Sequence, residues 1–345
     1  MYIRAAAGIS PQISFEQILR LPASYSGNSL SCAEPDYTKL FDARMIRRMS
    51  RIIKMGVAAA IDCLQQADLQ NPGAIITGTA YGCLADTELF LAKMVENKEE
   101  LLTPTSFIQS THNTVGAQIA LMLKCHNYNN TFVHRGFSFE SAMLDAITLL
   151  HENAVEDILV GGVDEITDTS HILLSRFGLY KQHSASNLDL YKEASKGTIA
   201  GEGAAFFLLS NQSSGNNYAK LEGMDTLYKP SSTEEVAVFI NDFLQRNKVQ
   251  ATDIDVLVSG ENGDAGNDKI YKELKKTLFK DIATQPFKQL CGEYPTAAAF
   301  ALWLCSNIIK TGKIPAHSEM KAPEKILIYN HYLTIHHSLY LLSAC

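Results

Sequence analysis

The sequence predicts an α/β protein in which helices cover both faces of its sheets, and three observations predict this class. Helical and strand patterns alternate along the chain. The strand patterns are short, continuous apolar runs, which are typical of sheets buried on both faces. After the polar run SNQSSGNNYAK at residues 210–220, the alternation starts again. We therefore expect a duplicated unit made of two similar halves, residues 1–214 and residues 215–345.

The first half supplies these patterns in order. Residues 1–7 are apolar and extended, and a turn follows them. Apolar side chains recur at helical spacing over residues 42–68, with Asp42 placed to cap a helix. The later candidates are a buried strand and glycine loop at 73–82, a helix at 110–123, a turn and helix after Phe132, a strand at 157–162, and a turn leading into an apolar strand within 197–209.

The second half repeats the alternation with its own elements. A helix is predicted at 234–247, a strand with a glycine loop at 253–263, and a second helix at 267–279. A long apolar helix follows at 296–312, and Gly312 is the expected stop. Two strands are predicted within residues 325–342.

Composition excludes several classes of protein. The chain has 345 residues, is 46% hydrophobic and 19% charged, and carries a net charge of −7, which argues against a nucleic-acid partner. It shows no secretory signal and no apolar run long enough for a membrane span, so we expect a cytoplasmic protein. The seven cysteines are scattered without metal-ligand spacing, and we interpret them as reduced, mostly buried thiols. No metal and no cofactor are expected.

The segment from Phe132 to Glu165 raises the question of a nucleophile. It predicts a strand end, a sharp turn, a helix, and a buried strand with a glycine pair. Many enzymes place a nucleophile at such a strand-to-helix turn, because the helix N-terminus stabilises an anion there. No cysteine lies between His134 and Ser138.

Several stretches resemble one family, the β-ketoacyl synthases of the thiolase fold. They are GISP, FDARMIRRMSR, GTAYG, DILVGGVDE, GTIAGEGAAFFLL and the downstream GND…K…G, in the family's order over nearly the whole chain. GTIAGEGA is the most specific of these matches. The sequence is most similar to a short, divergent group in bacterial aryl-polyene and flexirubin-type pigment pathways. The resemblance implies a five-layer αβαβα core, a dimer built on that core, and acyl chains delivered on an acyl carrier protein.

The family's reaction uses a cysteine thiolate, two histidines that stabilise an enolate oxygen, and a lysine. Counting back from the glycine pair places the nucleophile at Gly136 or Phe137, and counting forward from CHNYN places it at His134. The first histidine falls at about Gly260, and Glu293 stands where the second belongs. Lys288 is retained, while the family's C-terminal glycine-rich stretch is replaced by YNHYLTIHHSL. Three of the four chemical groups are therefore missing.

This combination resembles the chain-length-factor subunits, which keep the fold and lose the chemistry. We therefore expect a protein that is inactive alone, pairs with an active ketosynthase in a condensing complex, and shapes its acyl tunnel. In the family, the segment at residues 103–118 crosses the dimer interface. The resemblance places Phe107, Ile108, Thr111 and His112 at that interface and tunnel.

Two other functions stay open at this stage. In one, Ser138 is the nucleophile of an acyltransferase or synthase, with His134 or His112 as its base. Against it stands the simpler interpretation that Ser138 caps the following helix and that Glu140 stabilises the first turn. In the other, the chain is a scaffold homodimer without a role in a tunnel.

The remaining polar residues each allow a functional and a structural interpretation. Lys288 and Glu293 are either a buried relic of the active-site loop or a partly exposed ion pair. We expect Glu202 to be a hydrogen-bonded structural carboxylate. His336 and His337 are expected to face core and solvent alternately. The basic segment at 44–54 is either a docking face for an acidic carrier protein or the solvated side of a helix.

Overall fold

The computed structural model describes residues 1–183, 185–192, 195–315 and 319–345. Ten strands of this part of the chain form one sheet in the order β10-β9-β11-β12-β8-β1-β7-β5-β3-β4. The strands of the first half are β1 (Tyr2–Ile9), β3 (Ala74–Gly78), β4 (Tyr128–Phe132), β5 (Asp157–Asp164) and β7 (Gly203–Ser210). Those of the second half are β8 (Ala219–Tyr228), β9 (Val256–Ser259), β10 (Ala283–Pro286), β11 (Lys325–Tyr332) and β12 (His336–Ser343). A small separate sheet pairs β2 (Ser26–Gly27) with β6 (Ala185–Ser186).

The two halves have the same strand order. In each half the first strand pairs antiparallel with the fifth, the fifth antiparallel with the fourth, the fourth parallel with the second, and the second parallel with the third. The halves join where Tyr2 and Ile3 of β1 pair with Lys220 and Ala219 of β8. On this repeated order we propose a division between residues 214 and 215, which lies between β7 and β8.

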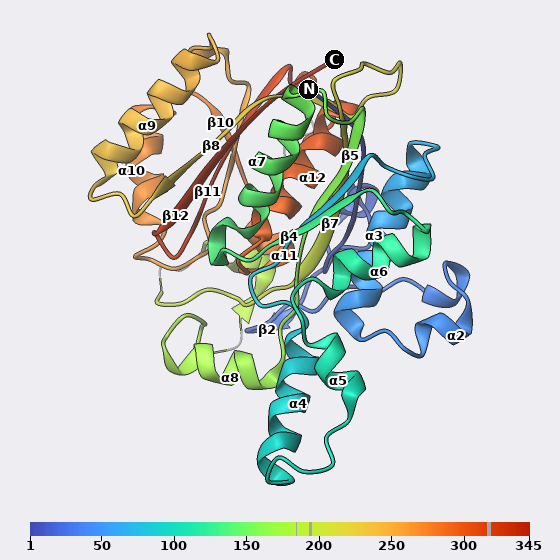
Figure 1. The fold of residues 1–345 in the computed structure, drawn as a ribbon. Coiled ribbons are helices and arrows are strands. Elements are labelled where there is room, and N and C mark those ends of the chain that lie inside the picture. The colour runs from blue at the N-terminus through green and yellow to red at the C-terminus, as the bar shows by residue number, and fades with distance from the viewer. Residues whose placement is uncertain (184, 193–194, 316–318) are drawn as a thin grey trace.

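The layers follow from which face each strand residue buries. Helices α7 (Ser138–His151) and α12 (Ala297–Thr311) lie in the middle, between the strands of the two halves, and share one core with both (Figure 1). Helix α3 (Arg51–Gln66), with α6 (Thr114–Leu123) packed beside it, covers the outer face of the first half. Helices α9 (Thr233–Arg246) and α10 (Lys269–Thr277) cover that of the second. This is the five-layer αβαβα arrangement that the resemblance to the β-ketoacyl synthases implies.

Shorter helices connect these layers. They are α1 (Phe15–Arg20), η1 (Tyr37–Lys39), α2 (Ala43–Ile46), α4 (Leu84–Glu96), α5 (Pro104–Gln109), η2 (Arg135–Phe137), α8 (Asp168–Arg176), η3 (Asn187–Asp189), η4 (Ala251–Asp253) and α11 (Lys288–Cys291). Helices α4 and α5 project together from the body of the molecule (Figure 1). In the described part of the chain, no helix has the length and apolar character needed to cross a bilayer.

The structure corrects one predicted helix and adds two strands. The helix expected over residues 42–68 is broken into α2 and α3, because Asp42 caps the short first helix through the amide of Arg44 and a new helix begins after Ser50. Strands β8 and β10 were not predicted. Strand β8 buries mainly its first residues, and β10 is only four residues long, so neither shows a continuous apolar run. Gly312 ends α12 with φ +68°, as predicted.

Candidate functional site

The positions that the family uses for chemistry lie at one end of the middle layer. They come from the β4–α7 turn, the loop after β9, the loop around α11, and the hairpin between β11 and β12. Side chains of the hairpin touch the first two of these positions, as the following contacts show. The sequence elements that the resemblance implicates are therefore brought together, although they are up to about 200 residues apart.

The β4–α7 turn is tight and uses Ser138 in an unexpected way. Arg135 has φ +48°, in the left-handed region that residues with a side chain rarely adopt. The Ser138 hydroxyl accepts a bond from the His134 amide at 2.8 Å and donates one to the Arg135 carbonyl at 2.8 Å. The cap position of α7 is Phe137, which makes no side-chain cap bond. The prediction that Ser138 caps α7 is therefore wrong: its hydroxyl closes the preceding turn.

Ser138 also lacks the surroundings of a nucleophile. Its side chain is buried, and both of its bonds go to the backbone. The His134 ring lies 3.3 Å from the Ser141 hydroxyl instead, and His112 packs against Gly82. In the described residues, no histidine ring is hydrogen-bonded to the Ser138 hydroxyl, so this geometry offers no base for it.

The place of Gly136 is filled by the C-terminal hairpin. A Cβ atom on Gly136 would lie 2.8 Å from the Cβ of Tyr332, 2.9 Å from its ring and 3.0 Å from the Cβ of His336. Phe137, the neighbouring candidate, packs edge-on against the His336 ring at 4.8 Å. No side chain of any size fits at Gly136 while the hairpin holds this position.

Gly260 is filled in the same manner. A Cβ atom there would lie 2.6 Å from the Tyr271 hydroxyl and closer still to the Asn330 side-chain oxygen. The Tyr271 hydroxyl is fixed by a 3.0 Å bond from the His331 amide. Asn330 and His331 belong to β11, so the same hairpin occupies both glycine positions.

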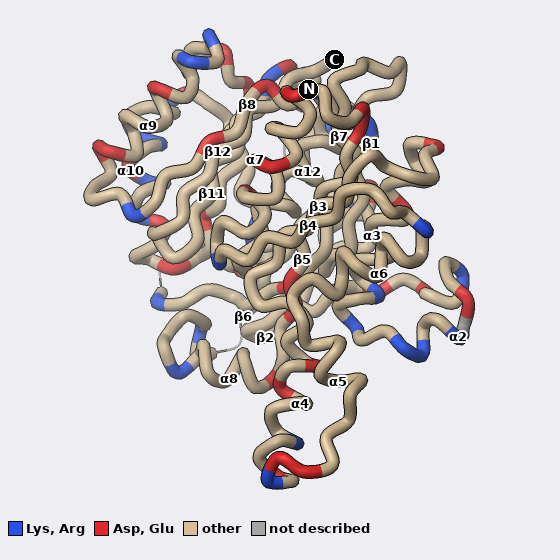
Figure 2. The backbone as a smooth tube through the Cα atoms, in the orientation of Figure 1, with Lys and Arg blue, Asp and Glu red and all other residues tan. Residues whose placement is uncertain are grey.

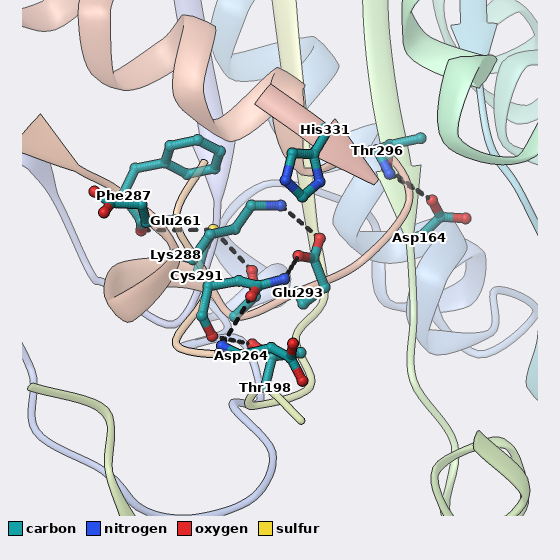
Figure 3. A network of polar contacts seen from close by, with 12 residues as sticks. Asp164, Thr198, Glu261, Asp264, Phe287, Lys288, Cys291, Glu293, Thr296 and His331 are labelled. Carbon is teal, nitrogen blue, oxygen red and sulfur yellow. Dashed lines mark hydrogen bonds and ion pairs between the residues drawn. The ribbon is translucent and has the colours of Figure 1, made fainter. Parts of the chain in front are cut away.

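Lys288 and Glu293 form a fully buried ion pair (Figure 3). The Lys288 ammonium lies 2.5 Å from one Glu293 carboxylate oxygen, and the side-chain amide of Asn262 donates a hydrogen bond to the other oxygen at 2.7 Å. The loop that carries Asn262 is fixed by Asp268, whose carboxylate accepts hydrogen bonds from the backbone amides of Asn262 and Gly263. The alternative of a partly exposed ion pair is therefore wrong.

Glu202 is a buried carboxylate whose oxygens accept four hydrogen bonds. It is buried and receives two bonds from the Arg51 guanidinium, at 2.6 and 2.5 Å, which is the strong bidentate geometry. The amides of Cys32 and Ile166 donate two more, at 2.8 and 3.2 Å. Arg51 thus turns inward from the predicted basic face, and the contacts of Glu202 join α3 to the segment before β7.

Asp164 is a buried carboxylate that sequence reasoning missed. Its two oxygens accept from the Thr79 hydroxyl, the amides of Ala80 and Tyr81, and the amide and hydroxyl of Thr296. Burial raises its pKa to about 6, and these donors oppose the rise. The carboxylate links the loop after β3 to the start of α12 and so joins the two halves. Its position two residues after the glycine pair of β5 was the available signal.

A small cavity of about 140 Å³ opens beside Glu293. Its wall is polar and aromatic, and includes Tyr180, Tyr332, Asn262 and Asn267. Burial raises the pKa of both tyrosine hydroxyls, so they stay protonated. This cavity has space for a few water molecules and not for an acyl chain of several carbons.

The histidines of the C-terminal hairpin are buried. His336 and His337 are 7% and 0% exposed, so the expectation that one of them faces solvent is wrong. The His337 ring lies 2.9 Å from the Tyr329 hydroxyl on the outer side of β12, and His336 packs on Phe137 on the inner side. Strand β12 lies between β11 and β8, and helices cover both of its faces. Successive side chains of β12 therefore alternate between two buried cores, and neither face is open to solvent.

Phe107 and Ile108 lie on α5, in the projecting part of the molecule. They are 56% and 64% exposed, and the centroid of the Phe107 ring lies 5.3 Å from that of the Phe90 ring on α4. Thr111 and His112 follow in the exposed turn between α5 and α6. Arg44, Arg47 and Arg48 are exposed around α2 (Figure 2).

The described side chains form no cluster with the composition of a metal-binding site. In the described ranges, no three His, Cys, Asp or Glu residues are placed to hold one ion. The cysteines are buried except Cys345, and burial raises the pKa of Cys291, the thiol nearest to Lys288 in sequence.

The comparisons with known proteins agree with this geometry. The family described as "Beta-ketoacyl synthase, N-terminal domain" matches residues 27–201. No curated protein sequence matches the chain. Among solved structures, the ishigamide ketosynthase/chain length factor is similar with a TM-score of 0.83 at 17% identity, covering 100% of this chain and 98% of that one.

Two further structures are similar over the same length. A β-ketoacyl synthase from Burkholderia phymatum STM815 has a TM-score of 0.80 at 13% identity, with 100% of this chain and 99% of that one covered. The AntDE:AntF complex, described as a type II PKS acyl-carrier protein with its ketosynthase, gives 0.80 at 13%, with the same coverage. These identities are low enough that the likeness shows the fold alone. With the family match over half of the sequence, the chain belongs to the β-ketoacyl synthase family.

Proposed function

We propose that this chain is a non-catalytic, chain-length-factor-like subunit that pairs with an active β-ketoacyl-ACP synthase and shapes its acyl tunnel. The observation that supports it most is the filling of Gly136 and Gly260 by Tyr332, His336 and Asn330 of one hairpin. The loss of a single catalytic residue would leave the rest of a catalytic site in place. Here, side chains from a distant part of the chain pack in close contact at the catalytic positions, so this structure has a filled site instead of a catalytic site.

The charges at the site support the same proposal. An enolate oxygen is stabilised by hydrogen-bond donors, whereas the ionised Glu293 can only accept bonds. Its two oxygens are already bonded to Lys288 and Asn262. The retained lysine therefore stabilises a carboxylate that replaces the histidine, instead of a group that acts on a substrate.

A pairing surface surrounds strand β4. This strand is the last of the sheet and pairs only with β3, so its outer edge is open to a partner. Large apolar side chains are exposed on α5, α6 and α7 and along β4: Phe107, Ile108, Leu121, Tyr128, Val133 and Leu144. A groove of about 710 Å³ runs between α6 and the β4 edge. An exposed strand edge with apolar neighbours is typical of an interface that a second thiolase-fold subunit covers.

The tunnel role is proposed for Phe107 and Ile108. Helix α5 carries both side chains outward beside this surface, where a bulky ring can reach into a partner subunit. Arg44, Arg47 and Arg48 supply the basic surface proposed to meet an acidic acyl carrier protein. We propose an aryl-polyene or flexirubin-type pathway, in which polyketide-like condensation extends an acyl chain. The ishigamide ketosynthase/chain length factor, which has a similar fold, supports such pairing.

Reconstitution tests the proposal directly. The chain is produced alone and together with a synthase that carries the cysteine and both histidines and is encoded beside it. We expect a heterodimer by light scattering, and products of defined length only from the pair. Steady release of carbon dioxide from malonyl carrier protein by the isolated chain would contradict the proposal.

The two alternatives give different results in the same preparation. An acyl adduct on the isolated chain, seen by intact mass after incubation with acyl carrier protein thioester, would favour an unorthodox nucleophile such as Ser138. A homodimer that excludes the synthase would favour the scaffold. The bonds of Ser138 to the backbone at 2.8 Å argue against the first of these.

A further inference from the structure

Glu140 is a buried acid that the proposed function does not use. It lies in the first turn of α7, where the sequence predicts a solvated carboxylate at a helix N-terminus. Instead it is 2% exposed, and neither of its oxygens has a hydrogen bond of good geometry. The hydroxyls of Ser338 and Tyr340 on β12 lie near enough to favour its charged form. The carboxyl group thus stands between a helix of the first half and a strand of the second.

Among the residues that the structure describes, Lys288 is the one buried cation that acts on this carboxyl group, and it is already paired. Lys288 favours ionisation of Glu140, but its ammonium contacts Glu293 at 2.5 Å. Two buried carboxyl groups therefore share one charge. Glu293 has two short hydrogen bonds, whereas Glu140 has only the poorly aligned hydroxyls of Ser338 and Tyr340, so Glu140 is the one that is protonated more readily. Burial raises the pKa of Glu140 to about 7.

The other titratable groups on the surrounding elements have partners of their own. On β12, His336 packs against Phe137; on β5, Asp164 is bonded to Thr79 and Thr296. On β4, the Tyr128 hydroxyl is exposed and bonded to Asp145, while Arg135 of η2 is exposed. Within the described ranges, these groups supply no second buried cation that could compensate an ionised Glu140.

We propose that the Glu140 carboxyl group is a proton-dependent latch between the two halves. While protonated, it lets the start of α7 pack on β12, and so keeps Tyr332 and His336 over Gly136. Once ionised, it becomes an uncompensated buried charge and loosens this contact. The folded state binds this proton more tightly than the unfolded chain does. The latch therefore holds fully below the unfolded pKa of about 4.3, and it is lost as pH rises through about 7.

Hydrogen exchange measures the latch where it acts. Peptides covering the start of α7 and strand β12 are followed from about pH 6 to about pH 8.5, with correction for the intrinsic exchange rate. We expect about a tenfold loss of protection in the native protein between about pH 6 and the folded pKa of about 7, and no further loss above it, because both the folded and the unfolded carboxyl groups are then ionised. Glu140→Gln, which keeps the shape of the neutral acid, should reduce that loss to less than twofold.

Glu165→Gln is the matched control. Burial raises the pKa of Glu165 to about 7 as well, but this group accepts a bond from the Ala85 amide, away from β12. The control should keep the native loss at α7 and β12. Equal protection at both pH values in the native protein, or a full loss in Glu140→Gln, would overturn the proposal. If Glu140→Gln does not fold, the native profile decides, because the loss at these peptides must level off near pH 7 and be absent from α3.

Discussion

Two Gly-Glu pairs, one from each half, lie against each other in this molecule and differ in what holds the carboxylate. The Gly201 amide donates to the Glu293 carbonyl at 3.0 Å, and Gly292 approaches Gly201 so closely that neither could carry a side chain. Glu202 meets a forked guanidinium and two backbone amides, whereas Glu293 meets one ammonium and one amide side chain.

The difference distinguishes a structural carboxylate, Glu202, from a carboxylate that replaces a catalytic residue of the family, Glu293; we call the surroundings of Glu202 the scaffold and those of Glu293 the rebuilt site. Arg51 is 33% exposed along its side chain and also contacts Glu34, so it has water and a second carboxylate besides Glu202. Lys288 is completely buried and has Glu293 alone as its ion-pair partner. Where the resemblance expects a histidine, the carboxylate provides the charge that the retained lysine needs. Glu202, by contrast, stands within the most specific motif of the sequence.

The largest effect is expected from neutralising these two carboxylates in turn. Glu293→Gln leaves Lys288 as an uncompensated buried charge and should cost about 3–5 kcal/mol. Glu202→Gln leaves Arg51 with Glu34 and water and should cost about 1–3 kcal/mol. Urea unfolding of both variants measures the order.

A double variant sharpens this comparison. Lys288→Met with Glu293→Leu removes both charges and should recover most of the stability lost in Glu293→Gln. If Glu202→Gln proved the more damaging single change, the contrast between scaffold and rebuilt site would not hold. Neither Glu293 variant should gain condensing activity, since the nucleophile is absent as well.

Acid is expected to unfold the rebuilt region through its histidines. Burial, reinforced by the nearby His337, lowers the pKa of His331 to about 3, and burial lowers that of His337 to about 4. The Thr334 amide donates to one His331 nitrogen, and the other lies 3.1 Å from the Asn267 carbonyl, which fits a neutral ring. The unfolded chain binds protons that the folded chain excludes. The contribution of these histidines to stability is therefore constant above about pH 6.5 and falls below it, by about 3 kcal/mol for His331 alone at about pH 4.

Melting temperature against pH checks this expectation. His331→Asn should lower stability at neutral pH and flatten the acid slope. The exposed His126 gives the matched control, because His126→Asn should leave the slope unchanged. An acid slope that is identical in the His331 variant would show that other groups cause the loss.

A smaller effect is expected from returning a thiol to the turn. Gly136→Cys forces a Cβ atom to within 2.8 Å of Tyr332 and should cost about 1–3 kcal/mol through overpacking. Gly215→Cys is the control, since no atom lies within 4 Å of its Cβ position. Chemical unfolding compares the two, and the Gly136 variant should acquire no acyl group from a carrier protein thioester. A stable variant that becomes acylated would mean that the hairpin moves aside readily.

Sequence patterns predicted the layers well, because a layer is specified locally. The continuous apolar runs of β5 and β7 and the glycine stop of α12 each carry their own signal. The site was predictable only as a set of missing groups at Gly136, Gly260 and Glu293. The two glycine positions are filled mainly by residues 330–336, and no local pattern relates these residues to either glycine. The buried state of Glu140 and the turn contacts of Ser138 escaped for the same reason, since tertiary packing overrode a favourable helix start.

The smallest effect on the isolated chain, and the most informative one for the pair, is expected from Phe107→Ala. The ring is 56% exposed and touches mainly Phe90, so its loss should change the stability of the single chain by less than about 1 kcal/mol. In the reconstituted pair, a ring that ends the tunnel stops a growing chain by overlap, and its removal should lengthen the products. If the ring is instead buried in the dimer interface without reaching the tunnel, its loss leaves a cavity that costs about 3–5 kcal/mol and weakens the dimer.

Leu121→Ala is the control, because Leu121 is also exposed near β4 and its loss should affect pairing without affecting product length. Light scattering establishes whether the pair is intact, and mass spectrometry measures the products. An intact pair with unchanged product lengths would remove Phe107 from the tunnel, and the surface around β4 would then serve pairing alone.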